Sequence, residues 1–241
     1  MMRFAVLLCA EDTEYVKKKY GGYFGVFLRM LAEEGEIWDV FDVAAGHFPD
    51  DQQIRLYDGF VITGSCNDAH ADDAWIRRLL ALLNKLDSMN KKILGICFGH
   101  QILARALGGK VHRAVSGWDI GVRTINFSSS TTIFANLEIP TSLFLIECHR
   151  DEVHELPSEA EVLAWSDKTR VEMFRYRDHI MGVQGHPEYT NDILLHLIDR
   201  LLQRNLIEES YAMEARANME KAEPNREAWK ELCTSFLKGR R

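Results

Sequence analysis

The stretch KILGICFGHQ, residues 92–101, decides how this chain is expected to fold. Its first half is apolar after Lys92 and reads as a buried strand, and a helical pattern begins at Gly99. Between them, G-x-C-x-G at residues 95–99 is the thiol form of the G-x-S-x-G nucleophile elbow. Glycines in that motif let the backbone pass close to a residue on a sharp, strained turn. The stretch therefore predicts a strand, a turn and a helix, with Cys97 at the turn.

Short apolar strands alternate with amphipathic helices in the first half of the chain. The predicted strands are residues 3–10, 37–43, 59–63 and 92–96. The predicted helices are residues 23–34, 52–57, a segment containing residues 75–86, and residues 99–107. This alternation favours an α/β fold of the flavodoxin type, with a mostly parallel central sheet and helices on both faces.

From residue 111 the pattern changes to consecutive strands. These are predicted at residues 122–127, 143–147, 162–166, 171–177 and 179–184, with a turn at Arg177-Asp178. Helices resume at residues 191–205, 208–221 and 226–237. We expect a single domain over residues 1–241, in which residues 207–241 form a C-terminal helical extension.

Composition limits the possible partners. The 241 residues are 46% hydrophobic and 27% charged, which is ordinary globular composition, and 29 basic minus 36 acidic side chains give a net charge of −7. We expect neither a nucleic acid nor a membrane partner, because the acidic chain attracts neither and has no 18-residue apolar run. The apolar start resembles a short signal segment, but it meets Glu11-Asp12, so a first strand is the better interpretation.

The cysteines point to a reducing compartment. They number five, an odd count, are widely spaced and contain no C-x-x-C, so neither a disulfide framework nor a zinc ribbon is indicated. We therefore expect the cytosol as the location and Cys97 as a free nucleophile. A helix N-terminus after Cys97 favours the thiolate and offers the Phe98 N–H to an oxyanion. The alternative is a buried, inert cysteine beside a strand.

A base for this thiol is predicted in VQGHPE, residues 183–188, at the end of an apolar strand. The His186 imidazole and the Glu188 carboxylate stand two residues apart, and Pro187 fixes the backbone between them. Glu188 can accept the imidazole N–H and favour an imidazolium–thiolate pair. Taken alone, the segment would favour a simple turn; together with the elbow, it favours a catalytic triad. A metal site is disfavoured, since no second ligand stands at helical spacing from His186.

Two further segments are expected at the carboxyl edge of the sheet, where such sheets bind ligands. Gly64-Ser65 ends a strand in small residues whose N–H groups can face a substrate oxyanion, although an ordinary turn is also possible. Residues 147–152, ECHRDE, form a polar cluster that alone would suggest an exposed hairpin end. The glycines near Tyr20 and Tyr23 do not follow a strand directly, so no nucleotide site is inferred.

These motifs together resemble the class I glutamine amidotransferase family. The elbow at residues 95–101, the GHPE segment 89 residues after Cys97 (186 − 97) and the Cys148-His149-x-Asp151 segment all resemble that family. In its GMP synthetase branch the last segment carries serine where this chain has Cys148. The plant γ-glutamyl peptidase group is more similar still. That similarity extends over residues 20–24, 48–51, 57–61, 64–65 and 236–240, and so over nearly the whole chain.

The resemblance implies a γ-glutamyl peptidase, that is, a thiol hydrolase with a Cys97–His186–Glu188 triad and no metal or other cofactor. It implies cytosolic removal of the γ-glutamyl residue from glutathione conjugates, in glutathione metabolism and glucosinolate biosynthesis. It also implies oxyanion donors at the backbone of Gly64, Ser65 and Phe98. The side chains implied to recognise the glutamyl head are those of Gln101, Cys148, His149 and Arg150.

Three alternatives remain open from the sequence. A glutaminase subunit that supplies ammonia to a separate synthase would carry the same triad. A non-catalytic binding protein on the same fold is disfavoured by the intact triad residues. A thiol α/β-hydrolase is disfavoured because its expected order is nucleophile, acid, then histidine. The sequence leaves open the preferred conjugate, the turnover of free glutamine, the oligomeric state, and the role of residues 20–23 and of the C-terminal helices.

Overall fold

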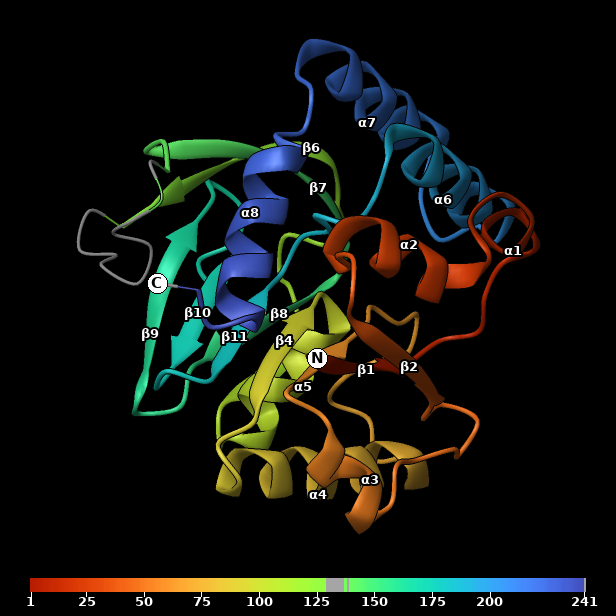
Figure 1. Cartoon of the computed structure of the whole chain (residues 1–241). Coiled ribbons are helices and arrows are strands. Elements are labelled where there is room, and N and C mark those ends of the chain that lie inside the picture. Colours follow the sequence, from red (N-terminus) through yellow and green to blue (C-terminus); the bar gives the residue numbers. More distant parts are fainter. Residues whose placement is uncertain (129–136, 138, 241) are drawn as a thin grey trace.

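A nine-stranded sheet forms the centre of the computed structural model, which describes residues 1–128, 137 and 139–240 (Figure 1). Its strand order is β2-β1-β3-β4-β11-β10-β9-β6-β7. Five neighbouring strands are parallel, namely β2 (Ile37–Asp42), β1 (Arg3–Leu8), β3 (Gly59–Ile62), β4 (Lys92–Ile96) and β11 (Ile180–Val183). The other four pair antiparallel, namely β10 (Met173–Tyr176), β9 (Ala160–Trp165), β6 (Asp119–Phe127) and β7 (Ser142–His149).

Alternate residues of the parallel strands enter two separate cores, as the two-residue period of a strand requires. In β1, Ala5 and Leu7 contribute to one core, and Phe4 and Val6 to the other. The first core is covered by α3 (Asp51–Leu56), α4 (Ala74–Ser88) and α5 (Phe98–Ala106). The second is covered by α2 (Gly22–Leu31) and α8 (Arg226–Leu237) (Figure 1). The predicted α/β fold with helices on both faces is therefore confirmed.

A third apolar cluster joins the antiparallel strands to two further helices. Ile120 of β6 and Ile146 of β7 pack with residues of α6 (Asn191–Gln203) and α7 (Glu209–Lys221). The helix α8, which belongs to the predicted C-terminal extension, packs its fully buried Trp229 into the sheet core and hydrogen-bonds the indole to the Phe144 carbonyl.

Most predicted elements are confirmed to within about three residues of their observed ends. The predicted Arg177-Asp178 turn joins β10 to β11, with Arg177 at a left-handed φ of 51°. Two features were not predicted. The helix α1 (Glu14–Tyr20) precedes α2, and β5 (Lys110–Arg113) pairs with β8 (Asp151–Glu155) in a separate small sheet. Within the described residues, no helix is both long and apolar enough to span a membrane.

Candidate active site

Cys97 lies at a strained turn between β4 and α5. Its φ of 53° and ψ of −104° are unusual for a residue with a side chain. The flanking glycines are required by close backbone contacts. A Cβ on Gly95 would lie 2.4 Å from the Gly99 carbonyl oxygen, and one on Gly99 would lie 2.3 Å from the Ile62 carbonyl oxygen. The elbow predicted from the glycine spacing is therefore present.

The structure brings His186 and Glu188 together beside Cys97. The parallel strands β4 and β11 are neighbours, so the segments that follow them meet at one edge of the sheet. His186 Nδ1 donates to Glu188 Oε1 at 2.8 Å, which leaves Nε2 for its hydrogen bond with the Cys97 thiol. All three side chains are buried, with exposed fractions of 6% for Cys97, 3% for His186 and 2% for Glu188. This is the arrangement of a nucleophile, a base and an orienting carboxylate.

The electrostatic surroundings keep the His186 ring protonated. Burial alone would lower the pKa of His186, but the negative charges and hydrogen bonds of Glu188 and Cys97 outweigh it and raise that pKa to about 10. At neutral pH the ring is thus an imidazolium that lies next to the Glu188 carboxyl group and the Cys97 sulfur. This arrangement can stabilise a thiolate nucleophile and can supply a proton to a leaving group.

Tyr189 completes the support of the imidazole and was not predicted from the sequence. Its ring stacks on that of His186, with the centroids 3.9 Å apart and the planes 2° from parallel. The Tyr23 ring from α2 lies 6.3 Å from the Tyr189 ring, centroid to centroid, and also lines the cavity, so Tyr23 of the 20–23 segment has a place at the site. The available signal was the aromatic residue that directly follows the HPE run.

The predicted oxyanion donors lie on the correct elements. Phe98 is the first residue of α5, so its N–H has no partner inside the helix. A Cβ on Gly64 would lie 3.0 Å from His186 Cε1 and 3.7 Å from Cys97 Cβ, so the Gly64 backbone borders both reacting side chains. The Ser65 hydroxyl donates to the Cys9 carbonyl at 2.7 Å and thereby anchors this loop. The roles of these N–H groups stay a prediction.

Gln101 and His149 both bind the backbone of Asp151. The Gln101 amide donates to the Asp151 carbonyl at 2.8 Å and to Gln184 Oε1 at 3.1 Å. His149 Nδ1 donates to the same carbonyl at 3.0 Å. Both side chains line the cavity, but the Gln101 amide nitrogen is already bonded within the protein, so its oxygen is the atom left for a substrate. Burial lowers the pKa of His149 to about 4, so its ring is neutral at pH 7.

Cys148 and Arg150 also line the cavity, as predicted. The Arg150 guanidinium lies 5.3 Å from the centroid of the Trp118 ring, a cation–π contact on the cavity wall. Burial raises the pKa of the Cys148 thiol, so it stays protonated. The structure therefore places all four predicted glutamyl-binding residues at the site without testing what they bind.

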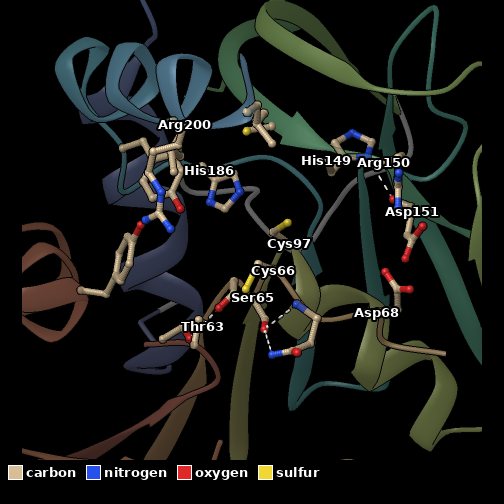
Figure 2. Close-up of a pocket in the computed structure, with 18 of the residues that line it drawn as sticks. Thr63, Ser65, Cys66, Asp68, Cys97, His149, Arg150, Asp151, His186 and Arg200 are labelled. Atoms are coloured by element: carbon tan, nitrogen blue, oxygen red, sulfur yellow. Dashed lines mark hydrogen bonds between the residues drawn. The ribbon is translucent and has the colours of Figure 1, made fainter. Parts of the chain in front are cut away.

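The cavity beside Cys97 holds about 300 Å³ and opens at the carboxyl edge of the parallel strands. Figure 2 shows Cys97 and His186 at its centre, with His149, Arg150 and Asp151 on one side and Arg200 on the other. Arg200, from α6, is a second lining residue that the sequence did not indicate. It stands 14 residues after His186 with no local motif, so only the packing of α6 brings it to the cavity.

In the part of the chain that the structure describes, two groups of side chains have spacings that suit a metal ion, namely Asp68, His70 and Asp151, and Glu147, His149 and Glu172. In the first group, Arg113 already pairs with Asp68 at 3.0 Å and Asp151 at 2.9 Å. In the second, burial raises the carboxyl pKa values, to about 8 for Glu172, which favours protonated acids over ligands. Neither donor set favours a metal in the chemistry of this site.

Comparison with known proteins agrees with the site. Residues 22–196 match the family model described as Glutamine amidotransferase class-I. Gamma-glutamyl peptidase 5 of Arabidopsis thaliana is 53% identical over 241 residues, covering 99% of this chain and 96% of that protein. Gamma-glutamyl peptidase 3 of the same plant is 49% identical, covering 98% of this chain and 97% of that protein.

Solved structures give the same fold. A glutamine amidotransferase from Thermotoga maritima superposes with a TM-score of 0.74 at 22% identity, covering 99% of this chain and 97% of that one. A glutamine amido transferase from Methylobacillus flagellatus superposes with a TM-score of 0.73 at 18% identity, covering 99% and 94%. At these identities the likeness concerns the fold alone.

Proposed function

Because this chain belongs to the class-I glutamine amidotransferase family, we propose that it is a hydrolase that removes a γ-glutamyl group through a thioester on Cys97. The observation that carries the proposal is the elbow thiol held against His186 and Glu188 at the cavity. The relatives that are about half identical over nearly the full chain are named gamma-glutamyl peptidases. Their name supports a γ-glutamyl peptide, rather than free glutamine, as the substrate.

The first half-reaction breaks the γ-glutamyl amide. The Cys97 thiolate attacks the γ-carbonyl carbon, and the carbonyl electron pair moves to oxygen. The N–H groups of Phe98 and of Gly64 or Ser65 stabilise this oxyanion, and one such donor is typically worth about 3–4 kcal/mol. As the C–N bond breaks, the His186 imidazolium gives its proton to the leaving nitrogen. A thioester, a neutral imidazole and a free amine result.

The second half-reaction restores the enzyme. Neutral His186 takes a proton from water, and the oxygen attacks the thioester carbonyl. The C–S bond then breaks, so that the γ-carboxylic acid of glutamate leaves and the thiolate–imidazolium pair forms again. Glu188 accepts the Nδ1 hydrogen bond throughout and keeps the ring oriented.

Within this class we propose glutathione conjugates as the substrates and the cytosol as the compartment. All five cysteines, including the nucleophile, are free thiols, which suits a reducing environment. A conjugate offers the γ-glutamyl amide that the triad needs, and its removal would serve glutathione turnover and the synthesis of sulfur-containing metabolites such as glucosinolates. Gln101, Cys148, His149 and Arg150 are proposed to hold the glutamyl head.

The test is intact-protein mass spectrometry after brief mixing with S-methylglutathione. We expect a transient mass increase of one glutamyl group, located on Cys97 by peptide mapping and lost in Cys97→Ala. The variant Cys66→Ala is the matched control, because Cys66 is an exposed thiol that also lines the cavity. Labelling of Cys66 instead of Cys97 would contradict the assignment of the nucleophile.

Steady-state assays separate the proposed reaction from its alternatives. Release of glutamate from S-methylglutathione should exceed release from free glutamine at equal concentration. Turnover of glutamine alone, and only beside a partner synthase, would identify a glutaminase subunit. A folded protein that is inactive on every γ-glutamyl compound would identify a binding protein.

A further inference from the structure

A second cavity, of about 680 Å³, adjoins the one that contains Cys97. The two share one stretch of wall, made by Ala10, Glu11, Thr13, Cys66, Asn67, Arg200 and Arg204. A molecule bound at Cys97 can therefore continue past this wall without leaving the protein surface. The proposed reaction at Cys97 gives this second cavity no role.

The two arginines on the shared wall are free to bind an anion. Among the described residues, neither Arg200 nor Arg204 forms a salt bridge, although the wall also carries Glu11. Three carboxylates that line the second cavity are already bonded to neighbours. Asp12 accepts from the Tyr23 N–H at 2.6 Å, Asp42 accepts from the Ala45 N–H at 2.9 Å, and Glu14 pairs with Lys17 at 3.1 Å.

The arginines lie on the side of Cys97 that the glutamyl head would leave free. In Figure 2, Arg200 lies beyond His186, whereas His149, Arg150 and Asp151 lie on the opposite side of Cys97. A γ-glutamyl group has its α-amino and α-carboxylate at one end and the scissile amide at the other. With its head at His149 and Arg150, the leaving part extends towards Arg200.

The walls of the second cavity beyond the arginines carry half-buried aromatic rings. Tyr15 stacks on His196 with centroids 4.7 Å apart, and Trp75 stacks on Phe98 with centroids 5.7 Å apart. Aromatic faces bind apolar and aromatic groups by dispersion and area burial. The leaving part that fits this combination has a carboxylate near the arginines and an apolar substituent beyond it.

We propose that Arg200 and Arg204 bind the C-terminal carboxylate of the leaving peptide, and that the second cavity receives the substituent on its cysteine sulfur. This inference rests on the proposed γ-glutamyl peptidase function and assigns its leaving-group specificity. The two residues act on binding and orientation of the leaving part, while the chemistry stays with Cys97 and His186.

The charge part is tested with Arg200→Gln and two substrates, S-methylglutathione and its C-terminal glycine amide. A charge-assisted hydrogen bond accounts for about 10- to 100-fold. We expect kcat/KM for the carboxylate substrate to fall by about that factor in the variant, and to fall much less for the amide. The matched control is Arg216→Gln on α7, whose guanidinium pairs with Asp199 beside Arg200 and does not line either cavity.

The size part is tested with Ala45→Trp, which adds a ring at an exposed position on the wall of the second cavity. We expect the ratio of kcat/KM for S-benzylglutathione to that for S-methylglutathione to fall at least about tenfold, because the added ring occupies the space for the larger substituent. Circular dichroism and thermal melts confirm that each variant is folded.

The outcomes separate this inference from the function on which it rests. Equal losses on the carboxylate and amide substrates in Arg200→Gln would overturn the carboxylate assignment. An unchanged benzyl-to-methyl ratio in Ala45→Trp would overturn the placement of the substituent. If the wild-type protein cleaves none of these compounds, the proposed function itself fails.

Discussion

The Cys97–His186–Glu188 group and the Glu147–Glu172 pair are two buried sets of ionisable side chains with opposite protonation behaviour. Glu147 and Glu172 are fully buried, and a carboxyl oxygen of each lies within 4.8 Å of the other and of a ring nitrogen of His149. The two sets are close neighbours, because a Cβ on Gly185, the residue before His186, would lie 2.2 Å from Glu147 Oε1.

The sign of the neighbouring charges explains the difference. Around His186, two negative partners overcome the cost of burial and keep the ring charged. Around Glu172, burial and the charge of Asp119 act in the same direction and raise the pKa to about 8. His149, whose ring lies within 4.8 Å of both carboxyl groups, is itself neutral, so it supplies no compensating charge. One set therefore holds a charged imidazolium, and the other holds protons on its acids.

The largest expected effect is that of removing the Cys97 thiol, which is both the proposed nucleophile and a partner of His186. Cys97→Ala should lower kcat/KM by about 10⁴-fold or more, as the loss of a covalent nucleophile does. It should also lower the pKa of His186, because the thiolate that helps to raise that pKa is gone. NMR titration of the imidazole checks the second result. An imidazole pKa that stays near 10 would mean that Glu188 alone sets the charge state.

Removing the other negative partner should have the next largest effect. In Glu188→Gln the amide still accepts the Nδ1 hydrogen bond but carries no charge, so burial lowers the pKa of His186. We expect kcat/KM to fall by roughly 10²- to 10⁴-fold. The pH profile is the sharper measurement.

The alkaline limb of that profile follows from the sign of the shift. A base with a raised pKa keeps its proton through neutral pH and loses it as pH approaches about 10. The wild-type activity should therefore decline only at high pH, and that decline should move to lower pH in Glu188→Gln. Glu227→Gln, on the exposed surface of α8, is the control. If the alkaline limb of the pH profile does not move, the Glu188 charge does not set the pKa of His186, and Glu188 only orients the ring.

The two sets also differ in how well the sequence predicts them. The triad rests on local signals, since Gly95 and Gly99 flank Cys97 and Pro187 separates His186 from Glu188. Because parallel strands end at one edge, two such motifs can be placed together without coordinates. The strand order and the side-chain contacts then follow from the fold.

The carboxyl pair carries no such signal. Glu147 lies at the end of a predicted strand that leads into a polar cluster, and Glu172 lies in the strand predicted at residues 171–177, where no motif marks it. Glu147 is buried by the pairing of β6 with β7 and by the packing against Gly185, and the Glu172 backbone bonds to Ala164 and Gln184, all of which are tertiary contacts. Arg200 was missed for the same reason, as were β5 and β8, which pair across about 40 residues. Tyr189 differs, because it directly follows the HPE run and so had a local signal.

A substitution at Gly185, which lies between His186 and Glu147, should lower stability more than it lowers activity. Gly185→Ala adds a methyl group where Glu147 Oε1 would be 2.2 Å away and Leu145 Cδ2 2.5 Å away. Overpacking of this kind costs about 1–3 kcal/mol of unfolding free energy. Urea denaturation measures the loss. Gly117→Ala is a control for glycine replacement, since no atom lies within 4 Å of its added Cβ, although its φ of 76° carries its own strain.

The change with the smallest expected effect on activity concerns how stability depends on pH. Glu172 has a folded-state pKa raised from 4.5 to about 8, so the folded protein holds this proton more tightly than the unfolded chain does. The unfolding free energy should therefore fall as pH rises from about 4.5 to about 8, and then level off. In Glu172→Gln the neutral amide replaces the protonated acid, so this part of the decline should disappear.

Urea melts of the wild type and Glu172→Gln at pH 5, 7 and 9 measure the difference, with Glu161→Gln as the control. Glu161 is an exposed carboxylate of β9 that pairs with Arg175, so its replacement should leave the slope unchanged. If Glu172→Gln keeps the wild-type slope, Glu172 is ionised in the folded protein and the contrast with the triad fails. A flatter slope with activity retained at pH 7 would show that the acids hold protons for the fold, while the ion pair at Cys97 serves the reaction.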